Sequence, residues 1–212
     1  MKKMKKMALA VLMMPLLLAC SGGSSTDANL YGSLPEKYEK FMQEKADLKK
    51  QAENIKTEAD KKELIEKSEK MQAEWKVKIE ESAKALNGKP IEVEKCDFTI
   101  TTPLSLEFTD FFSNSNLTPS FKINGEATAT SDIKTNNDYI LTSEKVYLVG
   151  YNAEGQEVYK TLVGNIDAEN VDGKAFVKAG TPVKFEHLIF SKSDIENGCK
   201  DVKIFKLEVK QH

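Results

Sequence analysis

The spacing of apolar residues divides the chain into a helical part and a β-rich part. Neither Gly nor Pro occurs between residues 36 and 87, and apolar side chains recur there every three or four positions, as on one face of a helix. After Pro90 the apolar residues alternate with Thr, Asn and charged residues, which is the pattern of half-buried strands. The sequence therefore predicts an α+β protein with a coiled-coil-like helical region at residues 33–88 and a β domain at residues 89–212.

The apolar stripe of the helical region has one break. It runs from Leu34 to Ala59 in steps of three and four and resumes at Leu64, five residues later. Two structures fit this pattern: one long helix of about 80 Å, or an antiparallel hairpin that turns near Asp60. We favour the hairpin, because two apolar stripes can cover each other whereas a lone helix needs a partner. The heptad-like spacing also allows self-association through the helical region.

Polar residues near these positions predict where the helices begin. Ser33 and Glu36 have the spacing of a capping box at the start of the region, and Asp60 and Glu63 have the same spacing at the break. Trp75 lies on the apolar stripe, so we expect it in the core.

About seven short strands separated by turns favour an antiparallel β-sandwich. Residues 146–151 are apolar on both faces, which is typical of a central strand, and residues 152–155 predict a hairpin turn. His187 shares a predicted strand face with Val183 and Phe185, so we expect it to be packed in the core or to lie at its rim rather than to act as a catalytic base. The expected strands cover residues 91–101, 104–109, 121–130, 139–151, 157–163, 183–190 and 202–210.

The amino terminus has the features of an export signal. Four lysines precede an apolar run at residues 7–18, which is shorter than the roughly twenty residues that a membrane-spanning helix needs. The sequence Leu17-Leu18-Ala19-Cys20 that follows resembles the lipobox of bacterial lipoproteins. This resemblance implies a signal peptide at residues 1–19, lipid on Cys20, and a flexible tether at residues 20–32.

The same resemblance implies a place in the cell envelope. In double-membrane bacteria, Ser after the modified cysteine usually directs lipoproteins to the outer membrane, and here that residue is Ser21. We therefore expect an outer-membrane lipid anchor facing the periplasm, with cell-surface exposure as the alternative.

Two segments of the β region resemble a second family. Residues 145–158 resemble the strand, turn and return strand of the FxLYD-like immunoglobulin-like domains found in bacterial lipoproteins, and residues 178–185 resemble their later loop and strand. The resemblance covers roughly residues 121–210. It implies a domain that acts in interaction or scaffolding.

Cys96 and Cys199 remain once Cys20 is set aside. An even pair of cysteines in an oxidising compartment predicts a disulfide. It would close a loop of about a hundred residues, which stabilises a fold by at most ~4.7 kcal/mol in the chain-entropy model. Two buried free thiols are the alternative.

Residues able to perform chemistry are scarce. All 31 basic residues are lysine, so the arginines that usually recognise phosphate are absent, and we expect no nucleic-acid partner. The histidines are His187 and the terminal His212, and none of the common hydrolase or nucleotide motifs occurs. We expect no catalytic residues, no metal and no cofactor. Exposed aromatic residues can anchor a partner, and the candidates are Phe108, Phe111 and Phe112, which could instead cap the sandwich core.

Together these features predict a membrane-anchored lipoprotein that binds or holds an envelope protein or glycan without catalysis. One alternative is a surface-exposed adhesive lipoprotein that recognises a ligand or glycan. The other is a glycan hydrolase that uses two carboxylates.

Overall fold

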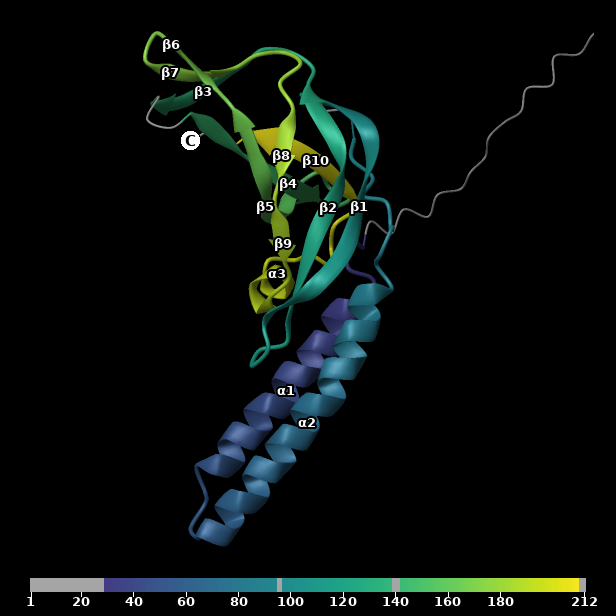
Figure 1. Ribbon diagram of the computed structural model, residues 1–212, viewed down its shortest axis with the longest axis vertical. Helices are drawn as coiled ribbons and strands as arrows, with labels where there is room; N and C mark the ends of the chain where they lie inside the picture. Colours follow the sequence, from purple (N-terminus) through teal and green to yellow (C-terminus); the bar gives the residue numbers. More distant parts are fainter. Residues whose placement is uncertain (1–28, 95–96, 139–141, 210–212) are drawn as a thin grey trace, which may run out of the picture.

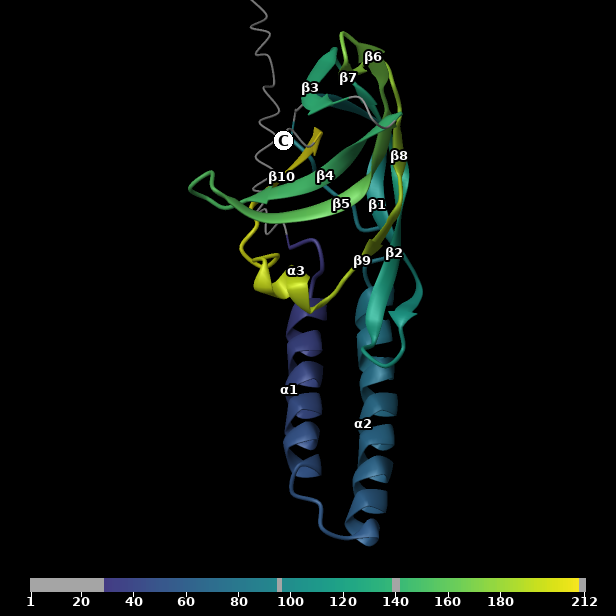
Figure 2. The same cartoon turned by 90° about the vertical axis from the view of Figure 1, so that its left-hand side faces the viewer.

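The computed structural model describes residues 29–94, 97–138 and 142–209, and its two long helices form a hairpin. Helix α1 spans Leu34–Ala52 and α2 spans Glu58–Lys84. In Figures 1 and 2 they lie side by side and extend away from the β layers. The predicted hairpin is confirmed, with the turn at residues 53–57, before Asp60.

Both capping boxes predicted for these helices are wrong. The N-cap of α2 is Thr57, which has an extended backbone and accepts a hydrogen bond from the Asp60 backbone N–H at 3.1 Å. Ser33 precedes α1 but has a helical backbone and makes no side-chain cap hydrogen bond. Proline in the first turn of α1 supplies the fixed φ that favours a helix start there instead.

The β region contains three antiparallel sheets in a sandwich-like arrangement. The first has the order β1-β2-β9, with bounds Phe98–Ser113, Thr118–Ala129 and His187–Ile189. The second has the order β10-β4-β5-β8, with bounds Ile204–Val209, Ser143–Tyr151, Glu157–Asp167 and Val183–Phe185. The third has the order β3-β7-β6, with bounds Ile133–Asp138, Lys174–Val177 and Glu169–Val171. A short helix, α3 (Lys192–Glu196), precedes β10.

Strand β4 lies between β10 and β5, which confirms the predicted central strand. The strand expected at residues 183–190 is instead split between two sheets, because β8 pairs with β5 and β9 pairs with β2. The break at Glu186 resets the two-residue alternation of side chains. His187 is therefore exposed, and Leu188 and Phe190 are buried in its place. Of the two predicted positions for His187, packed in the core or at its rim, the packed one is wrong.

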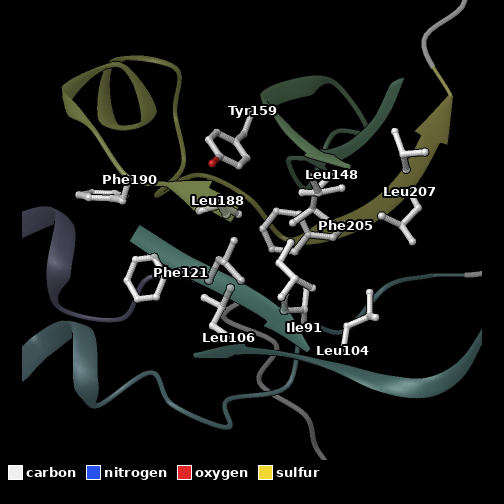
Figure 3. Packing of buried hydrophobic residues seen from close by; sticks show 14 of the residues in the cluster. Ile91, Leu104, Leu106, Phe121, Leu148, Tyr159, Leu188, Phe190, Phe205 and Leu207 are labelled. Atoms are coloured by element: carbon white, nitrogen blue, oxygen red, sulfur yellow. The ribbon is translucent and has the colours of Figure 1, made fainter. Parts of the chain in front are cut away.

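One buried cluster runs through the β layers and into the hairpin. In the interior shown in Figure 3, Leu106 and Phe121 of the first sheet lie across from Leu148 and Phe205 of the second. The cluster continues through an aromatic group at the base of the hairpin: Tyr31, Tyr38, Phe41, Trp75, Phe121 and Phe190. Trp75 is 6% exposed, so its predicted place in the core is confirmed.

The flexible tether was predicted to last to residue 32, and this bound is wrong because Leu30 and Tyr31 belong to the fold. Both are buried, and Tyr31 is fully inaccessible to solvent. The Tyr31 ring packs 4.6 Å from the Phe190 ring, centroid to centroid. The segment just before α1 is therefore part of the fold and fixes where the preceding chain leaves it.

Candidate functional site

The three candidate phenylalanines have different surroundings. Phe111 is buried and Phe108 is half-buried, and the Phe108 ring packs edge-on against Phe111 and Phe121 with centroids 5.6 and 6.0 Å away. Phe112 is 71% exposed. Two of the three candidates therefore cap the core, and Phe112 alone among them faces solvent.

The turn after these phenylalanines is occupied by the helical hairpin. The Tyr38 hydroxyl donates to the Asn116 carbonyl at 2.9 Å, and the Lys45 ammonium donates to the Ser115 carbonyl at 2.9 Å. From α2, the Gln72 side-chain amide donates to the Asn114 carbonyl at 2.8 Å. These contacts join the β1–β2 turn to both helices, so this stretch positions the hairpin.

A buried polar chain sits behind the same junction. The Tyr31 and Tyr159 hydroxyls are 2.8 Å apart, and Tyr159 donates to Asp194 Oδ1 at 2.7 Å. Asp194 Oδ2 accepts from the backbone N–H and the hydroxyl of Ser191 in a capping box that starts α3. Burial and the negative charge of Asp194 raise the pKa of both tyrosines. The spacing of Ser191 and Asp194 was the sequence signal for this cap.

Two of the three cysteines, Cys20 and Cys96, lie outside the described residues. Lipid on Cys20 and pairing of Cys96 with Cys199 therefore stay predictions, and His212 is also outside the description. Cys199 is 1% exposed, and burial raises the pKa of its thiol to about 12. Its thiol therefore stays protonated at neutral pH and is a poor nucleophile there.

Far from the sheets, a groove of about 530 Å³ opens between the two helices. Its apolar floor comes from both helices, and its polar side chains are two lysines and one serine. The lining residues are Met42, Lys45, Ala46, Leu48, Lys49 and Ala52 of α1, with Leu64, Ile65 and Ser68 of α2.

The groove is open because, apart from the β1–β2 turn that Lys45 contacts, none of the described elements packs on this half of the hairpin. Near the sheets, Trp75 and Ile79 of α2 are buried by the β domain and by α1. Further out only Leu48 is buried, Leu64 is half-buried, and Ile65 is 49% exposed. Two helices can bury the seam between them but leave the sides of that seam in water. The groove is therefore apolar surface that a further helix could cover.

Sequence reasoning placed some of these residues, among them Leu48, Ala52 and Leu64, on an amphipathic stripe but did not find the groove. Ile65 lies next to the stripe position Leu64, and a pair of adjacent apolar residues on an otherwise charged helix was the available signal.

No protein-family model, curated protein or solved structure matches the chain. Within the described ranges, neither long helix combines the length and the apolar content needed to cross a membrane.

Proposed function

We propose that this chain is an exported lipoprotein, anchored through lipid on Cys20, that acts without catalysis by binding an envelope component along its helical hairpin. The lysines and apolar run before Ala19, and the lipobox-like residues that end at Cys20, support the anchor. The proposed location is the outer membrane, facing the periplasm. The observation that carries the binding role is the open apolar groove between α1 and α2.

The point at which the chain enters the fold determines how far the hairpin extends beyond the lipid anchor. Asn29 accepts a hydrogen bond from the Lys89 ammonium, and the adjoining Gly32 lies against Leu86, so the chain enters where the hairpin meets the sheets. The nine residues from Cys20 to Asn29 would reach about 15–18 Å. Helix α2, with 27 residues, is about 40 Å long. The hairpin is therefore an arm that extends past the tether's reach, and it does not separate the lipid from the sheets.

The chemistry of the groove favours an amphipathic helix as its occupant. Its apolar floor is flanked by Lys45 and Lys49, and it runs along the helix pair, which suits a helix that lays an apolar stripe between α1 and α2. Covering such a groove removes apolar surface from water, which stabilises the complex by about 25 cal/mol per Å².

Photo-crosslinking in the intact envelope tests the binding role. A photoreactive amino acid would replace Ile65 in the groove or, as a matched control, Val77, which is 57% exposed on the same helix but does not line the groove. We expect protein adducts at position 65 and none above background at position 77. Equal yields at the two positions would contradict the proposal. Intact mass of the membrane-extracted protein tests the anchor, and an unmodified Cys20 would refute it.

We further propose that the β region is an immunoglobulin-like domain related to the FxLYD-like family. The order β1-β2-β9 corresponds to strands A-B-E of that fold, and β10-β4-β5 corresponds to F-C-C′. Cross-strand contacts measured by nuclear magnetic resonance would test this correspondence, because it requires β2 to pair with β9 and β4 with β10. Pairing of β8 with β9 in one sheet would exclude it.

A further inference from the structure

We infer that the occupant of the groove is the same groove on a second copy of this chain, so that two arms pair side by side as a four-helix bundle. This inference rests on the proposed binding role of the hairpin. Four-helix packing is the simplest way for two identical helix pairs to bury their remaining apolar sides.

The groove carries both a protruding and a receding part, as a twofold contact requires. Ile65 of α2 protrudes, with 49% of its surface exposed, while Ala46 and Ala52 of α1 line the groove with small side chains. A twofold axis parallel to the arms places α2 of one copy opposite α1 of the other at the same height. The register of the hairpin, in which Lys67 contacts Gln51 and Trp75 contacts Glu44, puts Ala52 level with Ile65. Each Ile65 then meets the partner's Ala52, and both copies point the same way from one membrane.

The charges of the arm are compatible with this pairing. Residues 42–72 contain eight lysines and eight acidic residues, so this part of the arm has no net charge and two arms do not repel each other through it. The lysines on the groove rim, Lys45 and Lys49, belong to α1. On α2, Glu69 follows Ile65 by one helical turn, so the same twofold axis brings it near the partner's Lys49.

The size of the contact predicts that pairing is weak in free solution. The uncovered part of α2, residues 58–71, is about 20 Å long, and two helices are about 20 Å wide. The face is therefore on the order of 400 Å² per copy, below the ~800 Å² per partner of a standard stable interface. Two anchored copies diffuse in one membrane, where their effective concentration is far higher. We therefore expect pairing at the membrane.

Crosslinking between two distinguishable copies tests the inference. One full-length copy carries the photoreactive residue at position 65 and one affinity tag; the other is otherwise unchanged and carries a second tag. After illumination of intact cells, we expect an adduct that contains both tags. Ala52→Glu in the second copy should lower its yield by about tenfold, because a carboxylate would be buried against Ile65. Ala73→Glu, an exposed α2 residue outside the groove, should leave the yield unchanged.

The outcomes separate this inference from the proposed function. An adduct at position 65 that contains another protein and never the second tag would overturn pairing but keep the groove as a binding surface. A doubly tagged adduct that Ala52→Glu and Ala73→Glu affect equally would also overturn the proposed contact. No adduct at position 65 above that at position 77 would overturn both.

Discussion

At the residue scale, Asp194 links three parts of the fold. Its carboxylate accepts from Tyr159 of β5 and from Ser191 at the start of α3, and Tyr159 is in turn 2.8 Å from Tyr31, which precedes α1. All three of these acidic or phenolic side chains are buried. A buried polar group without its partner costs more than the hydrogen bond itself contributes. This chain of contacts therefore fixes Tyr31, just before α1, against β5 and the start of α3.

Tyr159→Phe tests that role. Removing one hydroxyl leaves Asp194 Oδ1 and the Tyr31 hydroxyl each without a partner that the structure shows, so we expect the free energy of unfolding to fall by about 1–3 kcal/mol in denaturant titrations. The control is Tyr151→Phe. The Tyr151 hydroxyl of β4 donates to Glu208 of β10, and both residues are half-exposed, so we expect a loss below about 1 kcal/mol. Equal losses would show that the buried network has no special role.

Because of the same two tyrosines, we expect the free energy of unfolding to fall at high pH. Their pKa is raised in the fold by burial, whereas unfolded tyrosines titrate near 10. Their contribution is therefore complete below about pH 10 and is lost as the pH rises above it, by up to about 1.4 kcal/mol per pH unit for each group. We expect a shallower decline between pH 10 and 11.5 for the variant that combines Tyr31→Phe with Tyr159→Phe. An unchanged slope in the denaturation midpoints would contradict the assignment.

At the element scale, the hairpin and the central strand could be predicted from sequence because their signals are local. The break between Ala59 and Leu64 indicated two helices, and an apolar pattern on both faces indicated β4. The cap at Thr57 was missed because Asp60 and Glu63 offered a more familiar spacing. The crossing at Glu186 and the sheet β3-β7-β6 could not be predicted, because they depend on pairing between segments far apart in the chain.

The two helix starts give a matched pair of substitutions. Thr57→Ala removes the hydrogen bond to the Asp60 backbone N–H, so we expect a loss of about 1 kcal/mol confined to the start of α2. Ser33→Ala removes no cap bond and should cost less than about 0.5 kcal/mol. Hydrogen exchange of the first amides of α2 measures the effect, with about fivefold faster exchange expected for Thr57→Ala. Similar effects of both substitutions would refute the assigned cap.

At the scale of the whole molecule, the helices and the sheets share one core. Tyr38 and Phe41 of α1 belong to the same buried cluster as Phe121 of β2 and Phe190. The sequence suggested a boundary near residue 88 because the composition changes there, but composition does not reveal which side chains meet. Tyr38 on the base of α1 packs against Phe190 of the β domain, while Phe41 packs against Trp75 of α2, so the aromatic cluster joins the helical seam to the sheets.

This shared core predicts that the two parts unfold together. Trp75 is the single tryptophan and lies in the hairpin, so its fluorescence reports that part, while hydrogen exchange within β5 reports the sheets. We expect both signals to give the same denaturant midpoint. A Trp75 transition at clearly lower denaturant would show that the hairpin is an independent unit.

The arm's open groove is the feature on which the proposed function depends, and its accessibility in the native membrane is the most direct measurement. Ile65→Cys and Val77→Cys would be labelled in turn with a water-soluble thiol reagent on isolated envelopes, with the parent protein as the background. We expect Cys at position 65 to react more slowly than Cys at position 77 in the membrane, and both to react equally once the protein is extracted and diluted. Equal labelling of the two positions in the membrane would contradict the proposal that the groove is a binding surface.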